Sequence, residues 1–192
     1  MAGVLVILAD GFEEIEAVAV IDVLRRADIK VVAAGVKDGP ITSARGVRII
    51  PDAALYAVRA LDYDMVVLPG GMPGTDNLAK DERVKKAVRE MYEAGKYTAA
   101  ICAAPYVLSE AGILSDKKAT SHPTFQQKLN AASVSESERV VVDGKVITSQ
   151  GAGTAIEFAL QLVEILVSKE RAEAISLAMV CAAKSVAKHK KA

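Results

Sequence analysis

The chain has 192 residues, of which 52% are hydrophobic and 25% charged, a composition typical of a folded globular protein rather than of a disordered chain. Its 24 basic and 24 acidic residues balance, which argues against nucleic-acid binding by bulk charge and against attachment to an anionic membrane. The length predicts one domain over residues 1–192. Two distant cysteines and an N-terminus without a signal-peptide pattern lead us to expect a cytoplasmic protein with free thiols.

The first half of the chain alternates strand and helix patterns. Residues 4–8 form a continuous β-branched apolar run, typical of a strand that is covered on both faces. Residues 14–27 show helical spacing, with acids in the first turn and arginines in the last, as the helix dipole favours. The pattern then predicts a strand at 30–35, a short hairpin at 41–50, a strand at 65–68 and a helix at 81–94.

The second half continues the same alternation. It predicts a strand at 97–101, a helix at 105–111, a hairpin at 140–149, and helices at 154–167 and 169–188. Repeated strand–helix–strand units favour an α/β fold with a mostly parallel sheet and helices on both faces. Ligands bind such sheets at the carboxyl ends of the strands, so the residues after each strand are the candidates for chemistry.

Cys102 is the sharpest of these candidates. It follows a buried strand, has Ala103 and Ala104 as small neighbours, and precedes Pro105, which suits the first turn of a helix. Small residues allow a tight strand-to-helix elbow, and a thiol at a helix N-terminus is expected to have a lowered pKa. The alternative is that Cys102 is a small buried core residue, and the local pattern does not choose between the two.

Glycines and acids after two other strands could assist this thiol. Gly70 and Gly71 could present N–H groups as an oxyanion hole, or could form an ordinary glycine-rich turn. One of Glu13, Glu14 and Glu16 could point across the sheet towards the thiol, with a raised pKa, and act as an acid. The alternative for each glutamate is a solvated residue at a helix start.

The remaining cysteine and the histidines give weaker signals. His122 could pair with Cys102 as a base, or be a loop histidine without a role. Cys181 stands among Ala, Met and Val in the last predicted helix, and we interpret it as core or interface packing. A zinc site is not expected, because the chain has no close cysteine pair and no pair of histidines at ligand spacing.

Together these motifs resemble the DJ-1/ThiJ/PfpI superfamily, and its DJ-1 branch in particular. The resemblance covers nearly the whole chain and is carried by residues 5–16, 22–27, 67–71, 100–105, 148–154 and 157–160. It implies a flavodoxin-like three-layer α/β sandwich, usually a homodimer. Peptidase-like members carry a histidine directly after the nucleophile, and Ala103 stands there in this chain, so a peptidase triad is not expected.

The resemblance also implies roles for individual residues. Cys102 matches the nucleophile of the family, and Glu16 matches the glutamate that hydrogen-bonds to it. The N–H groups that surround the thiol are implied at Gly71 and Ala103, and a histidine near the site is implied at His122. Basic residues around the pocket are implied at Arg45 and Arg26.

The activity that the resemblance implies is a cofactor-independent glyoxalase, or a deglycase acting on early glycation adducts. Cys102 would attack the aldehyde, and Glu16 or His122 would move the proton. The alternative is a redox sensor or redox-controlled chaperone, in which the same thiol is oxidised to a sulfinate. The expected partners are a small α-oxoaldehyde or glycated substrate and a second copy of the chain, with no metal, nucleic acid or membrane.

Overall fold

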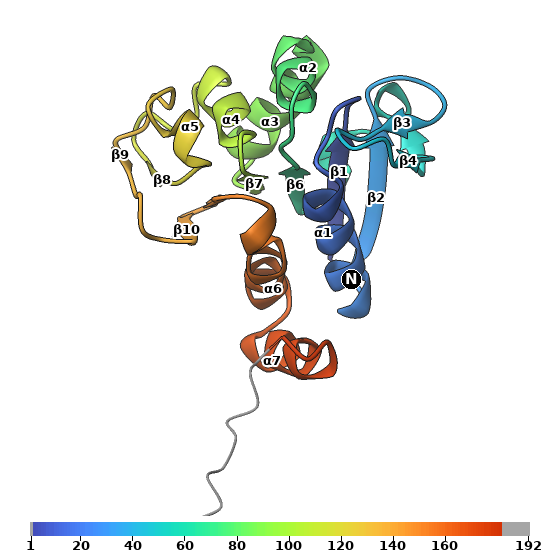
Figure 1. Ribbon diagram of the computed structural model, residues 1–192, viewed down its shortest axis with the longest axis vertical. Coiled ribbons are helices and arrows are strands. Elements are labelled where there is room, and N and C mark those ends of the chain that lie inside the picture. Colours follow the sequence, from blue (N-terminus) through green and yellow to red (C-terminus); the bar gives the residue numbers. More distant parts are fainter. Residues whose placement is uncertain (1, 182–192) are drawn as a thin grey trace, which may run out of the picture.

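The computed structural model describes residues 2–181, which form a seven-stranded sheet between two layers of helices (Figure 1). The strand order is β10-β11-β7-β6-β1-β2-β5, and every neighbouring pair is parallel except β10 with β11. The predicted α/β architecture is therefore confirmed. The strands are β1 (Gly3–Leu8), β2 (Lys30–Gly35), β5 (Ala53–Ala54), β6 (Met65–Leu68), β7 (Tyr97–Ile101), β10 (Val140–Asp143) and β11 (Val146–Ser149).

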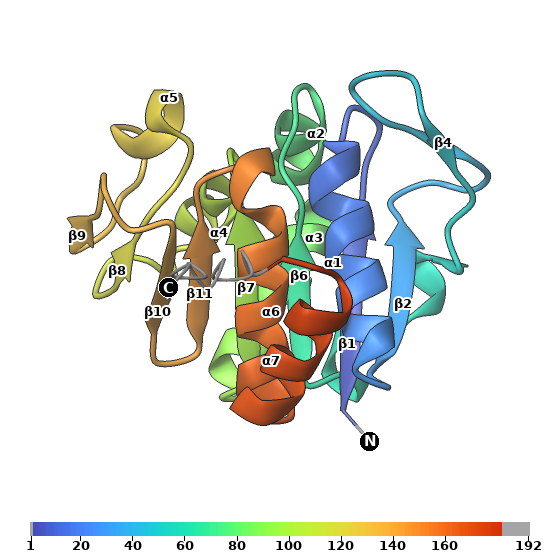
Figure 2. The same ribbon diagram turned by 60° about the horizontal axis from the view of Figure 1, so that its bottom comes forward.

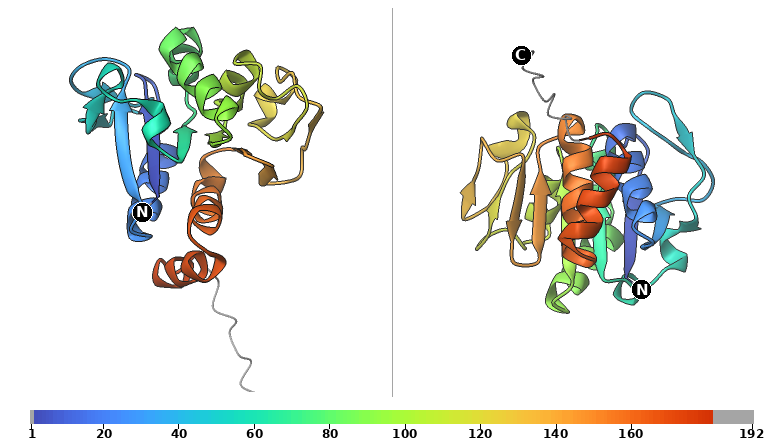
Figure 3. Two further views of the ribbon diagram at one scale, coloured as in Figure 1. Left: turned by 180° about the vertical axis from the view of Figure 1, so that it is seen from behind. Right: turned by 90° about the horizontal axis from the view of Figure 1, so that it is seen from below.

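Helices cover both faces of the sheet (Figures 2 and 3). One layer consists of α1 (Glu14–Arg26), α6 (Ala155–Leu166) and α7 (Lys169–Ala178), and the other of α2 (Gly74–Lys80), α3 (Glu82–Glu93) and α4 (Pro105–Glu110). No helix in residues 2–181 is both long and apolar enough to cross a membrane. Short elements complete the fold: β3 (Ile41–Thr42), β4 (Arg48–Ile49), β8 (Lys118–Ala119), β9 (Ser133–Val134), α5 (Pro123–Gln126) and 3-10 turns at 55–57, 60–62 and 152–154.

β1 shows why the sheet needs both layers. All six of its residues are buried, as the continuous apolar run predicts. Val4, Val6 and Leu8 pack into the core that includes α1 and α6, whereas Leu5 and Ile7 pack into the core on the opposite face. Each such side chain contributes about 1.5–3 kcal/mol when fully buried. The carboxyl end of β1 is therefore a firmly held base for the residues that follow it.

The helix after β6 was not predicted from the sequence. Residues 74–80 form α2, which is seven residues long and is followed directly by α3. Its first residue is Gly74 and it contains Asn77, and both residue types have low helix propensity. The helix forms because packing of Leu78 and Thr75 against the rest of the layer overrides that propensity.

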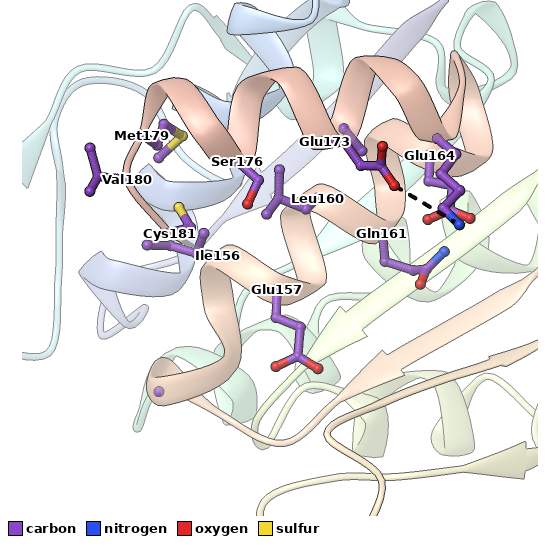
Figure 4. A pocket seen from close by; sticks show the side chains of 13 residues that line it. Ile156, Glu157, Leu160, Gln161, Glu164, Glu173, Ser176, Met179, Val180 and Cys181 are labelled. Atoms are coloured by element: carbon purple, nitrogen blue, oxygen red, sulfur yellow. Dashed lines mark ion pairs between the residues drawn. The ribbon is translucent and has the colours of Figure 1, made fainter. Parts of the chain in front are cut away.

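The C-terminal helix is shorter than predicted. α7 ends at Ala178, Met179 caps it, and Val180 has a φ of 59°, so the backbone leaves the helical path there. Residues 182–188 of the predicted helix lie outside the described residues. Cys181 is exposed, so the core alternative of its interpretation is wrong, and the interface alternative stays a prediction. It borders a cavity of about 620 Å³ between α6 and α7 (Figure 4).

Candidate active site

Cys102 lies at the carboxyl end of β7, where the chain turns into α4. Its φ is 64°, in a region that non-glycine residues seldom occupy and that costs about 1–3 kcal/mol. Three hydrogen bonds hold this conformation. The Cys102 N–H donates to the carbonyl oxygen of Ser149 (2.9 Å), and the Cys102 carbonyl accepts from the His122 N–H and the Ser121 hydroxyl (2.8 Å each). The elbow is thus fixed from two neighbouring segments of the chain.

Glu16 is fully buried in the first turn of α1. Its Oε2 accepts a hydrogen bond of 2.8 Å from the Gly70 N–H, while its Oε1 is buried without a partner among the described residues. Burial raises the pKa of Glu16 to about 7, although the Gly70 N–H and the Cys102 thiol act in the opposite direction. A carboxyl group with this pKa can both donate and accept a proton near neutral pH.

The pKa of the Cys102 thiol is also raised, to about 12. Burial is the largest cause and the charge of Glu16 adds to it, whereas the N–H groups of Gly71 and Ala103 act to lower it. The lowered pKa expected at a helix N-terminus is therefore wrong, because burial of the thiol and the neighbouring carboxyl group of Glu16 outweigh the N–H groups. When Glu16 is protonated its charge no longer opposes a thiolate. The thiol is thus suited to react by passing its proton to Glu16.

The absence of a side chain at Gly70 brings Cys102 and Glu16 together. A Cβ atom at Gly70 would lie 2.7 Å from the Cβ of Cys102 and 2.9 Å from Oε2 of Glu16. Real Cβ atoms do not approach other atoms so closely, so any other residue would push the thiol and the carboxyl group apart. The same residue donates its N–H to Glu16, and Gly70 is therefore part of the site.

Three further glycines join the loop after β1 to the loop after β6. Gly71 has a φ of 91°, and a Cβ there would collide with the backbone of Glu13. A Cβ at Gly11 would lie 2.5 Å from Cδ of Pro73, and one at Gly74 would lie 2.5 Å from the backbone nitrogen of Phe12. The two loops therefore meet backbone against backbone, with no room for side chains between them.

A cavity of about 290 Å³ opens above the thiol. Six of the residues singled out in the sequence line it, namely Cys102, Gly71, Ala103, His122, Arg45 and Glu13, the last of which was one of the three candidate acids. It is completed by Ala44, Met72, Thr124 and Phe125. These four were not predicted, because all of them stand in loops or short elements without a periodic pattern. The only signal for them in the sequence is their position next to a predicted site residue or strand end.

His122 stands at the edge of this cavity. A Cβ at Gly151 would contact both Cδ2 of His122 (3.7 Å) and Sγ of Cys102 (3.9 Å), so the ring and the thiol both border Gly151. Nδ1 of His122 lies 2.9 Å from Oγ1 of Thr124. The imidazole is thus oriented by a neighbouring hydroxyl group and is close to the thiol.

Arg26 is placed elsewhere. It lies in the last turn of α1, while Glu16 lies in the first, and it does not line the cavity above the thiol. Its guanidinium group forms an ion pair of 2.7 Å with Asp22. Hydrogen bonding to Asp22 raises the pKa of Arg26, and Cys181 contributes to the same rise. The structure therefore brings Arg26 towards Cys181, and we assign it no part in the chemistry at Cys102.

The remaining site residues come from the segments that follow the parallel strands, Glu16 from the first turn of α1 and the others from loops and short turns. The carboxyl ends of β1, β6 and β7 lie at one end of the sheet (Figure 2). Within residues 2–181, no group of three or more His, Cys, Asp or Glu side chains is arranged to hold a metal ion. The chemistry available among these residues is that of one thiol, one buried carboxyl group, one imidazole and two N–H groups that face the sulfur.

The chain is similar in sequence and in structure to proteins of one family. The sequence profile of the DJ-1/PfpI family matches residues 2–165. The chain is 43% identical to protein dj-1beta of Drosophila melanogaster over 93% of its own length and 96% of that protein. It is 38% identical to the glutathione-independent glyoxalase DJR-1.2 of Caenorhabditis elegans, covering 90% and 91% of the two chains. The solved structure of oxidized Toxoplasma gondii DJ-1 superposes with a TM-score of 0.90 at 40% identity, covering 94% and 98%.

Proposed function

Because the chain belongs to the DJ-1/PfpI family, we propose that it is a thiol enzyme that converts α-oxoaldehydes such as methylglyoxal into 2-hydroxy acids without a cofactor. One observation carries the proposal: a thiol at a strained elbow lies beside a buried carboxyl group with a pKa of about 7, below an open cavity. The family includes glyoxalase-type enzymes, and a similar protein of Caenorhabditis elegans is named as one.

The first step is addition of the thiol to the aldehyde. Sγ of Cys102 forms a bond to the aldehyde carbon while the carboxylate of Glu16 takes the thiol proton. The negative charge that develops on the former carbonyl oxygen faces the N–H groups of Gly71 and Ala103, which support the sulfur in the free protein. Glu16 then returns that proton to this oxygen, so the product is a neutral hemithioacetal, Glu16 is again a carboxylate, and no separate thiolate has to form beforehand.

The second step moves a proton between two carbons. The hydrogen on the former aldehyde carbon leaves as a proton and returns to the neighbouring ketone carbon, which gives a thioester of a 2-hydroxy acid. Glu16 has a suitable pKa for both transfers, and His122, which also borders Gly151, is the other candidate. Water then breaks the carbon–sulfur bond. Methylglyoxal plus water gives lactate, so oxidation of one carbon balances reduction of the other.

Removal of early glycation adducts follows from the same chemistry. Such adducts form reversibly from amines or thiols and the free aldehyde, so an enzyme that consumes the aldehyde draws them back to the unmodified groups. We therefore propose the glyoxalase reaction as the primary activity and the deglycase effect as its consequence.

The test is turnover of methylglyoxal by the purified chain without glutathione. Lactate should form catalytically, and its C2 should carry deuterium when the reaction runs in D₂O, because a proton held by Glu16 exchanges with solvent. Lack of lactate from the unmodified chain would overturn the proposal. So would full activity after alkylation that mass spectrometry locates at Cys102.

A second candidate function is redox sensing or redox-controlled chaperoning through the same thiol. It is favoured by the similarity to a DJ-1 structure described as oxidized, and by the partial exposure of Cys102. The N–H groups of Gly71 and Ala103, with a protonated Glu16, could hold the oxygens of a sulfinate. Peroxide titration followed by peptide mass spectrometry should then add two oxygen atoms to Cys102. Selective oxidation of Cys181 would count against this function.

We also propose that the chain works as a cytoplasmic homodimer. Ile15 and Val18 on α1, and Val47 and Ile50 on the hairpin of β3 and β4, expose between 47% and 80% of their surface. Val18 and Ile50 border the same groove, and exposed apolar side chains that lie together are typical of an interface. The same hairpin carries Arg45, which lines the cavity, so a partner placed there would adjoin the site. Substituting Val18→Asp should convert a dimer to a monomer in sedimentation experiments.

A further inference from the structure

We infer that the cavity above Cys102 is shaped for α-oxoaldehydes with an apolar, ring-sized substituent, and that Met72 and Phe125 determine this specificity. The inference rests on the proposed function and specifies the substrate class of the same site.

The cavity is larger than methylglyoxal requires. The cavity measures about 290 Å³, and a water molecule takes about 30 Å³ in the liquid, so there is room for about ten water-sized groups. Methylglyoxal has only five non-hydrogen atoms, whereas phenylglyoxal has ten. A substrate as small as methylglyoxal would leave much of the cavity filled with water.

The lining of the cavity is both polar and apolar. Its polar part consists of the groups that take part in the proposed reaction, which are the thiol, its N–H donors and the imidazole, and of the charged side chains of Glu13 and Arg45. Met72 and Phe125 are the large apolar side chains of the lining. Met72 is 43% exposed, although burial of a methionine side chain is favourable. An apolar substituent would cover such a surface.

Both residues stand next to the reacting groups. Met72 directly follows Gly71, whose N–H faces the sulfur. Phe125 lies one turn after His122, and its N–H donates to the His122 carbonyl (2.7 Å). A substituent that extends from an aldehyde bound at Cys102 into the cavity therefore has these two side chains among its neighbours.

The ring of Phe125 is held in place by its neighbours. Tyr106 packs against it at 62° with ring centroids 6.2 Å apart, and Nζ of Lys128 lies 4.2 Å from its centroid. An aromatic contact of this kind contributes about 0.5–1.5 kcal/mol beyond area burial. Met72 is unbranched and can adapt to a bound ring, and its sulfur makes favourable contacts with aromatic groups. A fixed wall and an adaptable wall together suit a flat apolar substituent.

The reaction with such a substrate balances as it does for methylglyoxal. Cys102 bonds to the aldehyde carbon of phenylglyoxal, the hydrogen of that carbon moves as a proton to the carbon that bears the ring, and water releases the product. Phenylglyoxal plus water gives mandelate, with no external oxidant or reductant.

The test compares kcat/KM for phenylglyoxal and methylglyoxal from initial rates of mandelate and lactate formation. The unmodified chain should prefer phenylglyoxal at least tenfold. Substituting Phe125→Ala or Met72→Gln should lower the ratio of the two kcat/KM values about tenfold, which is the effect of a lost apolar contact of this size. Leu177→Gln is the matched control, because Leu177 is an exposed apolar residue that does not line the cavity, and it should leave the ratio unchanged.

The outcomes separate the inference from the proposed function. If both substrates yield 2-hydroxy acids but methylglyoxal is preferred, or if neither variant moves the ratio, the inference is overturned while the proposed function stands. If neither substrate yields a 2-hydroxy acid, the proposed function itself fails. Should Phe125→Ala not fold, Met72→Gln carries the test, since Met72 is an exposed residue outside the buried core.

Discussion

The two cysteines of this chain each border a cavity, yet only one of them has reactive surroundings. Cys102 stands at a strained elbow, with N–H groups facing its sulfur and a buried carboxyl group beside it. Cys181 is exposed after α7, at the edge of the larger cavity (Figure 4). That cavity is lined by Glu157, Glu164 and Glu173 and by one basic residue, Lys169, which pairs with Glu173 (3.9 Å). No N–H donors converge on the thiol there to support a developing anion among the groups that the structure describes. The size of a cavity is thus a poorer guide to chemistry than the groups that converge on its thiol.

The largest expected effect comes from exchanging each sulfur for oxygen. Cys102→Ser should abolish turnover of α-oxoaldehydes, because a serine hydroxyl is far harder to deprotonate than a thiol and Glu16 is too weak a base for it. Cys181→Ser should keep the rate within about twofold. Steady-state kinetics on both variants checks this. Loss of activity in Cys181→Ser with activity retained in Cys102→Ser would show that Cys181, not Cys102, is the nucleophile.

The next largest effect on turnover should come from substituting Glu16, beside Cys102, and not from Glu164, in the cavity near Cys181. Glu16→Gln should lower turnover by about 10²- to 10⁴-fold, because it preserves the shape of the side chain but removes proton transfer. Glu164→Gln, from the larger cavity, should have no effect on turnover. In the unmodified chain kcat/KM should rise with pH through about 7, since Glu16 must be ionised to take the thiol proton. Equal effects of the two substitutions would remove Glu16 from the mechanism.

Stability should show the cost of burying this carboxyl group. The pKa of Glu16 is raised in the folded chain from its ordinary value of 4.5 to about 7, so the fold binds a proton that the unfolded chain releases. The stabilisation that the folded chain gains from this proton is about 3 kcal/mol. It is fully present below pH 4.5 and is lost as the pH rises through about 7. Denaturant unfolding at pH 4 and at pH 8 measures this effect. Between these two pH values the free energy of unfolding of the unmodified chain should fall relative to that of Glu16→Gln. A constant difference between the two chains would contradict the raised pKa.

A smaller effect on stability should distinguish Gly70, beside Cys102, from Gly153, at the larger cavity near Cys181. Gly70→Ala should destabilise the chain by about 1–3 kcal/mol and lower turnover, because its Cβ would lie 2.7 Å from Cys102 and 2.9 Å from Glu16. Gly153→Ala, at the larger cavity, should be neutral within about 0.5 kcal/mol, since nothing lies within 4 Å of a Cβ there. Thermal unfolding of both variants provides the measurement, and equal melting temperatures would show that the site tolerates a side chain at residue 70.

Much of the fold could be predicted from the sequence because its periodic signals are strong. The run at β1 predicted a strand buried on both faces, and the Asp143–Gly144 turn predicted the β10–β11 hairpin. The convergence of Glu16, Gly71 and Cys102 could also be anticipated, since the carboxyl ends of parallel strands meet at one edge of the sheet. Which glutamate faces the thiol came from the family resemblance rather than from periodicity.

Other features could not be predicted because they depend on tertiary contacts. α2 forms against the propensity of Gly74 and Asn77, and the end of α7 depends on the backbone of Val180 rather than on the apolar pattern around it. The distance of Arg26 from the site follows from the length of α1. Met72 lies in the loop after β6 and Phe125 in the short helix α5, and only the folded chain places both on one cavity.

The backbone contact between the loops after β1 and β6 has a consequence for the timing of the reaction. Gly11, Gly71 and Gly74 bring the two backbones into direct contact, so we expect these loops to move together rather than to open as a lid. The N–H of Gly71 is then in place at the thiol before a substrate arrives, and binding does not have to order it. Association should follow one exponential in stopped-flow experiments, with no slow isomerisation, and its rate should be set by diffusion into an open mouth.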